Sequence, residues 1–402
     1  KLNIIYGGFQ MPSKTNNNNS GVLMQKVTRG VNTPLWLAAL VCIVGALFYF
    51  YDFFLQSLPG IISLDLMRDL NIGSAALGLL SGTYFFAYTP TQLIAGLSYD
   101  RFGPRALLTI MITTCSVGAI LFSFADSLLL AALGRLLMGF SSAFAFICAL
   151  GLISQWFDKR LFSILTGLVQ SLSSLGAITA ALPMSFFVSV YGWRDVTFYV
   201  GVIGLLLALI VFLIVRNSPN LAKLSSKSSS NSKNKNKVDK GVLLQALRHL
   251  ILLLSKKHTW AIGLYAFVMW APMTIFTELW GIPFLSNVLG MSETQSNAHM
   301  TFIWIAVAIC SPFVGLLSEM SNKRLLWLRL TALSGLLASC FILFMPHMNS
   351  FLLWVMLFCF GIGPAGSILS FAVVRDYNSK NLGVAIGFNN MMVVLGGAFF
   401  QP

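Results

Sequence analysis

The chain has 402 residues, of which 57% are hydrophobic and only 9% are charged, with a formal net charge of +14. A water-soluble domain carries about 25% charged residues, so this composition excludes an ordinary soluble protein and predicts a surface that faces lipid. The six cysteines lie singly inside apolar runs, without a CxxC pair or a Cys/His cluster. This pattern argues against a disulfide framework, and the sequence predicts no metal and no cofactor.

Long apolar runs follow one another along most of the chain. A helix needs about 20 apolar residues to cross a bilayer. Eleven runs of this kind are found, at 35–60, 75–99, 106–125, 128–156, 162–190, 196–215, 260–289, 298–318, 325–345, 351–374 and 382–402. The sequence therefore predicts an all-α membrane protein.

The spacing of these runs divides the chain into two parts. Residues 1–33 are expected to form a disordered tail, and 34–216 a bundle of six spans. A polar linker follows at 217–258, in which the apolar stretch near 241–254 is too short to cross and is expected to lie in the interface. Residues 259–402 then hold five spans. An even plan needs a sixth, so we expect two pseudo-symmetric six-helix bundles with the twelfth span missing.

The basic residues fall on one side of the predicted spans. With a cytosolic N-terminus, all of the 26 Lys and Arg except Arg68, Arg135 and Arg194 lie on the cytosolic side. Cytosolic loops are the ones enriched in these residues. The positive charge therefore indicates a multi-pass topology, and not a nucleic-acid partner.

The loop after the second span combines glycines with charges. It contains Gly96, Asp100, Arg101, Gly103 and Arg105. A glycine lets two helices approach closely, and another permits a tight turn. An acid in such a loop can form charge-assisted bonds to a neighbouring helix end or to an arginine. We expect these residues to form a cytosolic gate.

The corresponding loop of the second half is less complete. It keeps Gly315, the acid Glu319 and the base Arg324, but it lacks the second glycine and the arginine after the acid. Together the two loops resemble the G-x-x-x-D-R-x-G-x-R signature of the major facilitator superfamily. This resemblance covers residues 34–402. It implies the facilitator fold and adds Glu319 and Arg324 to the gate, although the second loop matches the signature less completely than the first.

A narrower resemblance is carried by the segments 49–56, 65–69 and 84–92. These look like the phagosomal transporters of intracellular bacteria, whose members import amino acids or handle nucleosides. The resemblance implies a location in the bacterial cytoplasmic (inner) membrane.

Three charged residues interrupt the apolar spans, namely Asp52, Arg135 and Glu278. A charge at a helix centre costs about 2.5 to 3.5 kcal/mol on insertion scales, so such residues suggest function. Asp52 follows Pro34, and Glu278 follows Trp260, by the same interval. We therefore expect two acids at matching depth on opposite walls, binding an ammonium group or a coupling proton. The alternative is that both are hydrated and inert at the outer interface. Arg135 could meet a substrate carboxylate or pair with an acid.

Aromatic and amide residues could complete a cavity between the halves. The candidates are Tyr49, Gln56, Tyr84, Tyr88, Gln170, Trp270, Trp304, Asn389 and Asn390. Prolines in the spans are expected to kink helices and to free carbonyl groups. They are Pro90, Pro183, Pro272, Pro312 and Pro364.

These features together favour a monomeric secondary transporter that works in the bilayer by alternating access. We expect a small polar solute, with an amino acid or short peptide favoured and a proton as the candidate coupling ion. Efflux of organic solutes or siderophores is the nearest alternative. A membrane hydrolase built on Ser141 is a remote one, because all four histidines lie at or outside span ends. The sequence predicts no enzyme.

Overall fold

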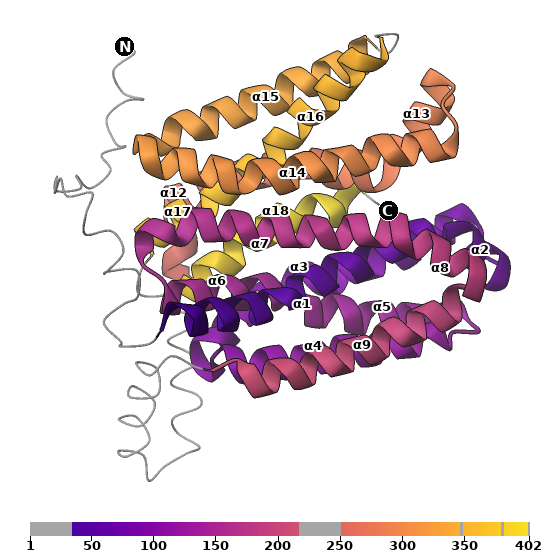
Figure 1. Ribbon diagram of the computed structural model, residues 1–402, viewed down its shortest axis with the longest axis horizontal. Helices are drawn as coiled ribbons and strands as arrows, with labels where there is room; N and C mark the ends of the chain where they lie inside the picture. Colours follow the sequence, from indigo (N-terminus) through magenta and orange to yellow (C-terminus); the bar gives the residue numbers. More distant parts are fainter. Residues whose placement is uncertain (1–33, 217–250, 346–348, 379–381, 401–402) are drawn as a thin grey trace.

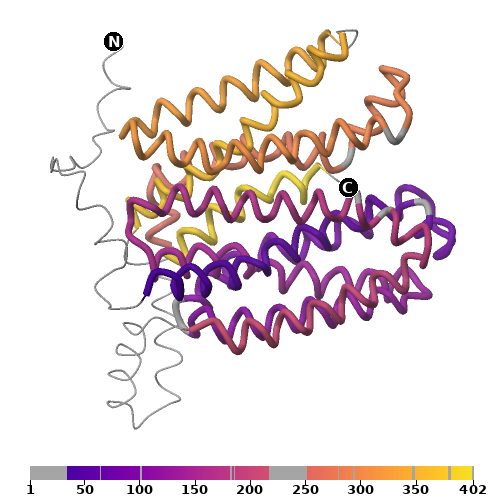
Figure 2. Tube along the Cα trace, in the orientation of Figure 1, coloured from indigo at the N-terminus to yellow at the C-terminus, as the bar shows by residue number. Residues whose placement is uncertain are grey.

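The structure is a computed structural model that describes residues 34–216, 251–345, 349–378 and 382–400. The described residues contain helices and no β-strand. The helices run side by side along one direction, with the first half of the chain below the second half (Figure 1, Figure 2). Most of the predicted interfacial helix near 241–254, and the tail at 1–33, lie outside the described residues.

The first half has the order that the apolar runs predicted. Its helices are α1 (Leu35–Ile61), the short α2 (Ser63–Asp69), α3 (Ser74–Phe102), α4 (Pro104–Ser123), α5 (Leu128–Ser142) with α6 (Ala145–Trp156), and α9 (Trp193–Ile214). The fifth span consists of η1 (Lys159–Leu161), α7 (Phe162–Thr179), the π-helix η2 (Ala180–Met184) and α8 (Ser185–Tyr191).

The second half repeats this arrangement over its described residues. It contains α12 (Lys257–Pro272), the π-helix η3 (Met273–Trp280), α13 (Gly281–Leu289), α14 (Glu293–Ser321), α15 (Arg324–Phe344), α16 (Ser350–Gly366) with α17 (Ile368–Tyr377), and α18 (Leu382–Phe400). Within the described parts of both halves, ten spans are long and apolar enough to cross a membrane. The long helix α3 has a lower mean hydropathy because Thr, Tyr, Ser and Gln side chains are interspersed along it.

Local signals explain where several helices begin. The Ser127 hydroxyl caps α5 by accepting from the Leu130 N–H, and Asn349 caps α16 in the same way at Leu352. A capping box between Ser292 and Gln295 opens α14. These polar caps occupy the ends of otherwise apolar segments, where the first backbone N–H groups lack helical partners.

The loop without its second glycine still makes the same turn. Gly103 has φ 74° between α3 and α4, as expected for a glycine at a tight turn. In the second half Asn322 has φ 53° between α14 and α15. Asparagine tolerates the left-handed region better than most residues, so it replaces the glycine that the sequence lacks.

The two ends of the bundle differ in charge. We call the end where α1 begins and α3 ends the basic face, because Arg105, Lys159, Lys257, Arg324 and Arg375 lie there. The other end, the opposite face, carries α2, α8 and α13 (Figure 1). There Asp69 of α2 accepts from Trp193 Nε1 at 3.0 Å and from Arg194 Nη1 at 2.5 Å at the start of α9.

The halves meet along two seams of helix pairs, α3 with α18 and α7 with α14 (Figure 1). A Cβ on Gly96 would lie 2.4 Å from the Gly383 carbonyl oxygen, and one on Gly387 would lie 2.5 Å from that of Gln92. These backbones approach so closely that only glycine fits, which confirms the expectation for Gly96.

The second seam repeats these contacts at the same spacing. A Cβ on Gly315 would lie 2.6 Å from the Ser163 carbonyl oxygen, and one on Gly167 would lie 2.6 Å from that of Ser311. In both seams the two contacts are four positions apart on each helix. The seams are therefore related by the pseudo-symmetry of the halves.

Proline has different effects along the spans. Pro183 lies in the π-helix η2, Pro272 directly precedes η3, and Pro364 lies close to the break between α16 and α17. Pro90 and Pro312, by contrast, lie within uninterrupted helices. Pro312 has no N–H for the Ala308 carbonyl four positions earlier, and the Ser171 hydroxyl of α7 donates to that carbonyl across the seam.

Candidate substrate site and gate

A small cavity lies between the two halves. Its volume is about 10 Å³, roughly the space that one water molecule needs. The first half contributes Tyr49, Phe53, Gln56, Phe85 and Tyr88, and the second contributes Trp270, Thr274, Asn390, Val393 and Val394. The site is therefore aromatic with a few polar groups, and in this conformation it is nearly closed.

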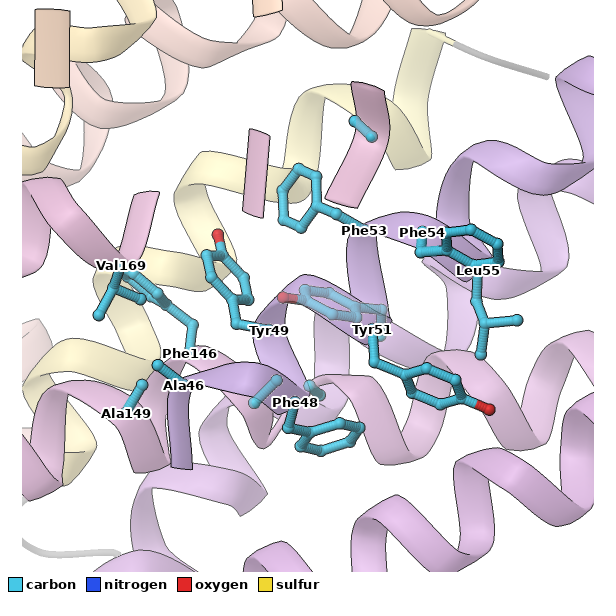
Figure 3. Packing of buried hydrophobic residues seen from close by; sticks show 14 of the residues in the cluster. Ala46, Phe48, Tyr49, Tyr51, Phe53, Phe54, Leu55, Phe146, Ala149 and Val169 are labelled. Atoms are coloured by element: carbon cyan, nitrogen blue, oxygen red, sulfur yellow. The ribbon is translucent and has the colours of Figure 1, made fainter. Parts of the chain in front are cut away.

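Aromatic rings from both halves pack around this cavity. Tyr49 and Phe53 lie on one side of α1, whereas Phe48 and Tyr51 lie on the other (Figure 3). The Tyr49 ring packs edge to face on Phe53 at 4.9 Å. Trp304 stands behind the lining, 5.6 Å from Phe53 and 6.5 Å from Trp270. Tyr49 and Trp270 thus line the cavity as predicted, and Trp304 supports them.

Asp52 lies inside the first bundle and is completely buried. The Tyr84 hydroxyl donates to its Oδ1, and Tyr84 stacks on the cavity residue Tyr88 at 5.6 Å between ring centroids. Within the described residues its Oδ2 has no hydrogen-bond partner. The alternative of a hydrated, interfacial Asp52 is therefore wrong, because the side chain points into protein.

Arg135 lies on the other side of Tyr84, with only 2% of its surface exposed. Its guanidinium is 4.7 Å from the centroid of the Tyr84 ring, and Nη1 donates to the Leu55 carbonyl at 3.0 Å. Pro59 explains this acceptor, because it cannot supply the helical N–H that Leu55 would otherwise bond. No carboxylate of the described chain lies within 4.0 Å of Arg135, and its Nε is unpartnered there.

Glu278 reaches α1 from the second half. It lies in the π-helix η3 and accepts from Gln56 Nε2 at 3.3 and 3.4 Å. Gln56 is four positions beyond Asp52, or about 6 Å along α1. Asp52 itself bonds to Tyr84 inside the first bundle. That the two acids lie at matching depth on opposite walls stays a prediction.

The predicted amides divide between the cavity and the bundles. Gln170 donates to the Ser173 hydroxyl at 2.8 Å, and Asn389 donates to Ser370 at 2.8 Å. The first bond lies within the first half and the other within the second half, so neither crosses between them. Asn390, the residue after Asn389, lines the cavity, and Asn389 does not. Phe53, Phe85 and Thr274 also line it but were not predicted. Phe53 could have been found, since it is one turn from Tyr49 on α1.

The second clasp on the basic face is well developed. Arg324 donates to both Glu319 and Asp376. Glu319 also accepts from the Ser163 hydroxyl of the first half at 2.9 Å. The sequence predicted Glu319 and Arg324 for this clasp. It missed Asp376, which lies at the end of α17 and becomes adjacent only in the fold.

A further basic residue crosses between the halves. Arg375 donates to the Lys159 carbonyl at 3.3 Å and lies 4.2 Å above the Phe162 ring. Arg105, which was predicted for the gate, contacts α9 of its own half, donating to Phe212 O at 3.1 Å. The side chains of Asp100 and Arg101 lie outside the described residues.

The hydrolase alternative rested on Ser141. Its hydroxyl donates to Leu137 O at 2.7 Å and to Met138 O at 2.9 Å, both in its own helix. This is the ordinary behaviour of serine in a buried helix, and it offers no positioned base.

The family model described as Major Facilitator Superfamily matches residues 41–401. The chain belongs to the major facilitator superfamily. Members of this superfamily are transporters, and the fold prediction is confirmed together with the membrane-spanning helices. The narrower resemblance to phagosomal transporters remains a prediction.

Curated relatives of this facilitator are distant. It is 24% identical over 377 residues to a chloroplastic ascorbate transporter of Arabidopsis thaliana, covering 90% of this chain and 68% of that protein. It is also 24% identical over 346 residues to a probable galactarate/D-glucarate transporter of Bacillus subtilis, covering 79% and 73%. The match with two other relatives covers only 36% and 47% of the length of those proteins.

A solved structure supports the facilitator fold. A bacterial homologue of the human lysosomal transporter Spinster, in an inward-facing and unoccupied conformation, superposes with a TM-score of 0.63 at 18% identity. The match covers 92% of this chain and 82% of that one. At this identity the likeness concerns the fold.

Proposed function

We propose that this facilitator is a secondary transporter that carries a small carboxylate-bearing solute by alternating access. The observation that carries the proposal is the buried guanidinium of Arg135. A cation inside a membrane bundle is costly and is retained where it serves a partner. Arg135 contacts the Leu55 carbonyl and the Tyr84 ring, and within the described residues it has no ion pair. Its fork of donors suits a carboxylate.

The relatives support an organic acid as substrate. Two relatives that align with 90% and 79% of this chain are named for ascorbate, an acid without a carboxylate, and for galactarate or D-glucarate. Neither name concerns an amino acid or a peptide, which the sequence favoured because acids and a base coexist in the spans. A carboxylate is the group that Arg135 would recognise, and sugar acids such as galactarate carry one.

Asp52 is our candidate for the coupling proton. Its carboxyl group is buried, and it shares Tyr84 with Arg135. Protonation of Asp52 would remove the negative charge next to Arg135 and leave the guanidinium to a substrate carboxylate. Proton and acid would then be carried in the same direction, as in a symporter.

The contacts on the basic face support a gate. There the Ser163 hydroxyl donates to Glu319, which Arg324 holds, and Arg375 donates to the Lys159 carbonyl, so two bonds cross between the halves. Toward the opposite face, a cross-half hydrogen bond runs from Gln56 to Glu278. We propose that the basic face is cytosolic, following the excess of Lys and Arg in cytosolic loops, and that the membrane is the bacterial inner membrane.

Uptake into proteoliposomes tests the proposal. The full-length protein is assayed with labelled gluconate, galactarate, alanine and glucose, with and without an inward proton gradient. We expect uptake of an acid and not of glucose, stimulated by the gradient. Arg135→Gln should lower uptake at least tenfold, and Asp52→Asn should abolish the stimulation. Arg160→Gln, at an exposed position of the basic face, serves as the control. Equal uptake of glucose, or unchanged uptake by Arg135→Gln, would contradict the proposal.

A further inference from the structure

The middle of the α3–α18 seam contains buried polar atoms without partners. On α3, Phe85, Gln92 and Gly96 approach α18, and Thr89 lies on the same strip of the helix. Gln92 is fully buried, and neither its Nε2 nor its Oε1 has a hydrogen-bond partner in the described chain. Thr89 Oγ1 is in the same situation. Buried polar groups of this kind are rare and call for an explanation.

The facing helix adds another such group. Asn390 is three positions after Gly387, which contacts Gln92, and it lines the cavity together with Tyr88. Its Nδ2 is buried and unpartnered among the described residues. The amide groups of Gln92 and Asn390, one from each half, therefore both lie near the Tyr88 hydroxyl, and of the two Asn390 lines the cavity.

The symmetry-related seam between α7 and α14 shows that polar side chains at these positions can find partners within the protein. Ser311 and Gln170 occupy in that seam the positions that Gln92 and Asn390 occupy here. The Ser311 hydroxyl donates to Val307 O at 2.7 Å, and Gln170 donates to Ser173 Oγ at 2.8 Å. Ser171 donates across the seam. At these two positions the α7–α14 seam therefore satisfies its polar side chains internally, whereas the α3–α18 seam leaves Gln92 and the Asn390 Nδ2 without partners. Further along α14, Ser318 Oγ is also unpartnered among the described residues.

The open groups define the chemistry that would fill them. Gln92 offers both a donor and an acceptor, Asn390 offers a donor, and the Thr89 hydroxyl can act either way. A hydroxyl group both donates and accepts, so it can bond all three. A charged group would lack a counter-charge among these residues. The site therefore suits an uncharged, hydroxyl-bearing part of a ligand.

We infer that Gln92, Asn390 and Thr89 form a subsite for the hydroxyl groups of the transported acid. The inference rests on the proposed function, in which Arg135 takes the carboxylate. It names the substrate class as polyhydroxy acids. Because the subsite joins α3 to α18, a bound hydroxyl group also stabilises the conformation in which this seam is closed. A site built to hydrogen-bond a hydroxyl group rejects an analogue that lacks it.

Pairs of acids with and without hydroxyl groups test this subsite. Gluconate is compared with hexanoate, and galactarate with adipate, by thermal stabilisation of the purified full-length protein. We expect the hydroxylated acid to bind at least tenfold more tightly in each pair. Gln92→Leu should reduce that preference at least tenfold and leave the binding of hexanoate and adipate unchanged. Thr89→Val is a second, nearly isosteric test. Ser311→Ala, at the symmetry-related position, should keep the full preference.

The outcomes separate the subsite from the proposed function. If hexanoate and adipate bind as well as their partners, the subsite is overturned and the carboxylate proposal stands. If Gln92→Leu weakens all four acids equally, Gln92 has a structural role and the subsite is overturned. If Gln92→Leu only raises the melting temperature without acid, the seam holds water alone, and the subsite is again overturned. If no acid binds and none is taken up, the proposed function fails, and the subsite fails with it.

Discussion

Replacing Gly96 by alanine should open the basic face. The new Cβ would lie 2.4 Å from the Gly383 carbonyl oxygen and 2.8 Å from its carbon, both backbone atoms that cannot rotate away. An ordinary contact begins at 3.4 Å, so α3 and α18 would have to separate by about 1 Å. Overpacking of this kind costs about 1–3 kcal/mol in the conformation that makes the contact. The free energy of a conformation in which the two helices are apart is unchanged by the substitution, so the population of the open conformation should rise about 5- to 150-fold.

Spin labels on the basic face would measure this shift. Cysteines replace the exposed Arg160 and Lys323, one in each half, in a background without the native cysteines, and electron–electron distances are recorded. Gly78→Ala is the matched control, because it lies on the same helix and its Cβ would meet nothing within 4 Å. We expect a longer distance to become prominent in Gly96→Ala and not in Gly78→Ala. Identical distributions for the two variants would refute the idea that this contact holds the basic face closed.

Three further predictions concern the charged clusters. Asp52 and Arg135 both contact Tyr84 without forming an ion pair, so Asp52→Asn and Arg135→Gln should be moderately coupled, with the double variant about 0.5–3 kcal/mol more stable than the sum of the two losses predicts; additive losses in denaturant titrations would disprove the coupling. Glu319→Gln should lower the free energy of unfolding by about 1–3 kcal/mol, because Glu319 and Arg324 are each only 10% exposed. Asp376→Asn, at a side chain that is 47% exposed, should lower it by less than about 1 kcal/mol. The reverse order in thermal melts would contradict the geometry. The hydrogen bond from Trp193 Nε1, together with Arg194 and Arg68, lowers the pKa of Asp69, so its stabilisation of α2 is complete above the ordinary carboxyl pKa and is lost as the pH falls through the lowered value, below about pH 4. Hydrogen exchange of α2 should therefore rise below that pH in the wild type and not in Asp69→Asn. Exchange that is independent of pH would exclude this role.

The spans were predictable because lipid imposes a simple rule. A bilayer requires long apolar helices, and every predicted run coincides with a described helix or chain of helices to within a few residues. The glycines of the loop after the second span were predictable for a related reason, since a close helix contact or a positive φ is a backbone geometry that few other residues allow. Gly96 and Gly103 are examples.

The site was only partly predictable, because an apolar run does not show how deep each side chain lies or which way it points. Asp52 and Glu278 were expected on opposite walls of one site, but Asp52 bonds to Tyr84 inside the first bundle and Glu278 bonds to Gln56. The choice between Asn389 and Asn390 depends on the rotation of α18 about its axis. The partner of Arg324, Asp376, is 52 positions away and is brought near only by the packing of α15 against α16 and α17.

The bond from Ser171 to the carbonyl group that Pro312 leaves free has a mechanical consequence. The same hydroxyl group also donates to Gly167 O, in its own helix, at 3.1 Å. In the alternating access proposed above, the halves would separate at this seam; the serine would then keep its bond to Gly167 O, and only the Ala308 carbonyl would need a new partner such as water. The bond between Ser171 and Ala308 can therefore break without leaving the serine hydroxyl unpaired. A transporter could form and break such a bond in every cycle at little cost in rate.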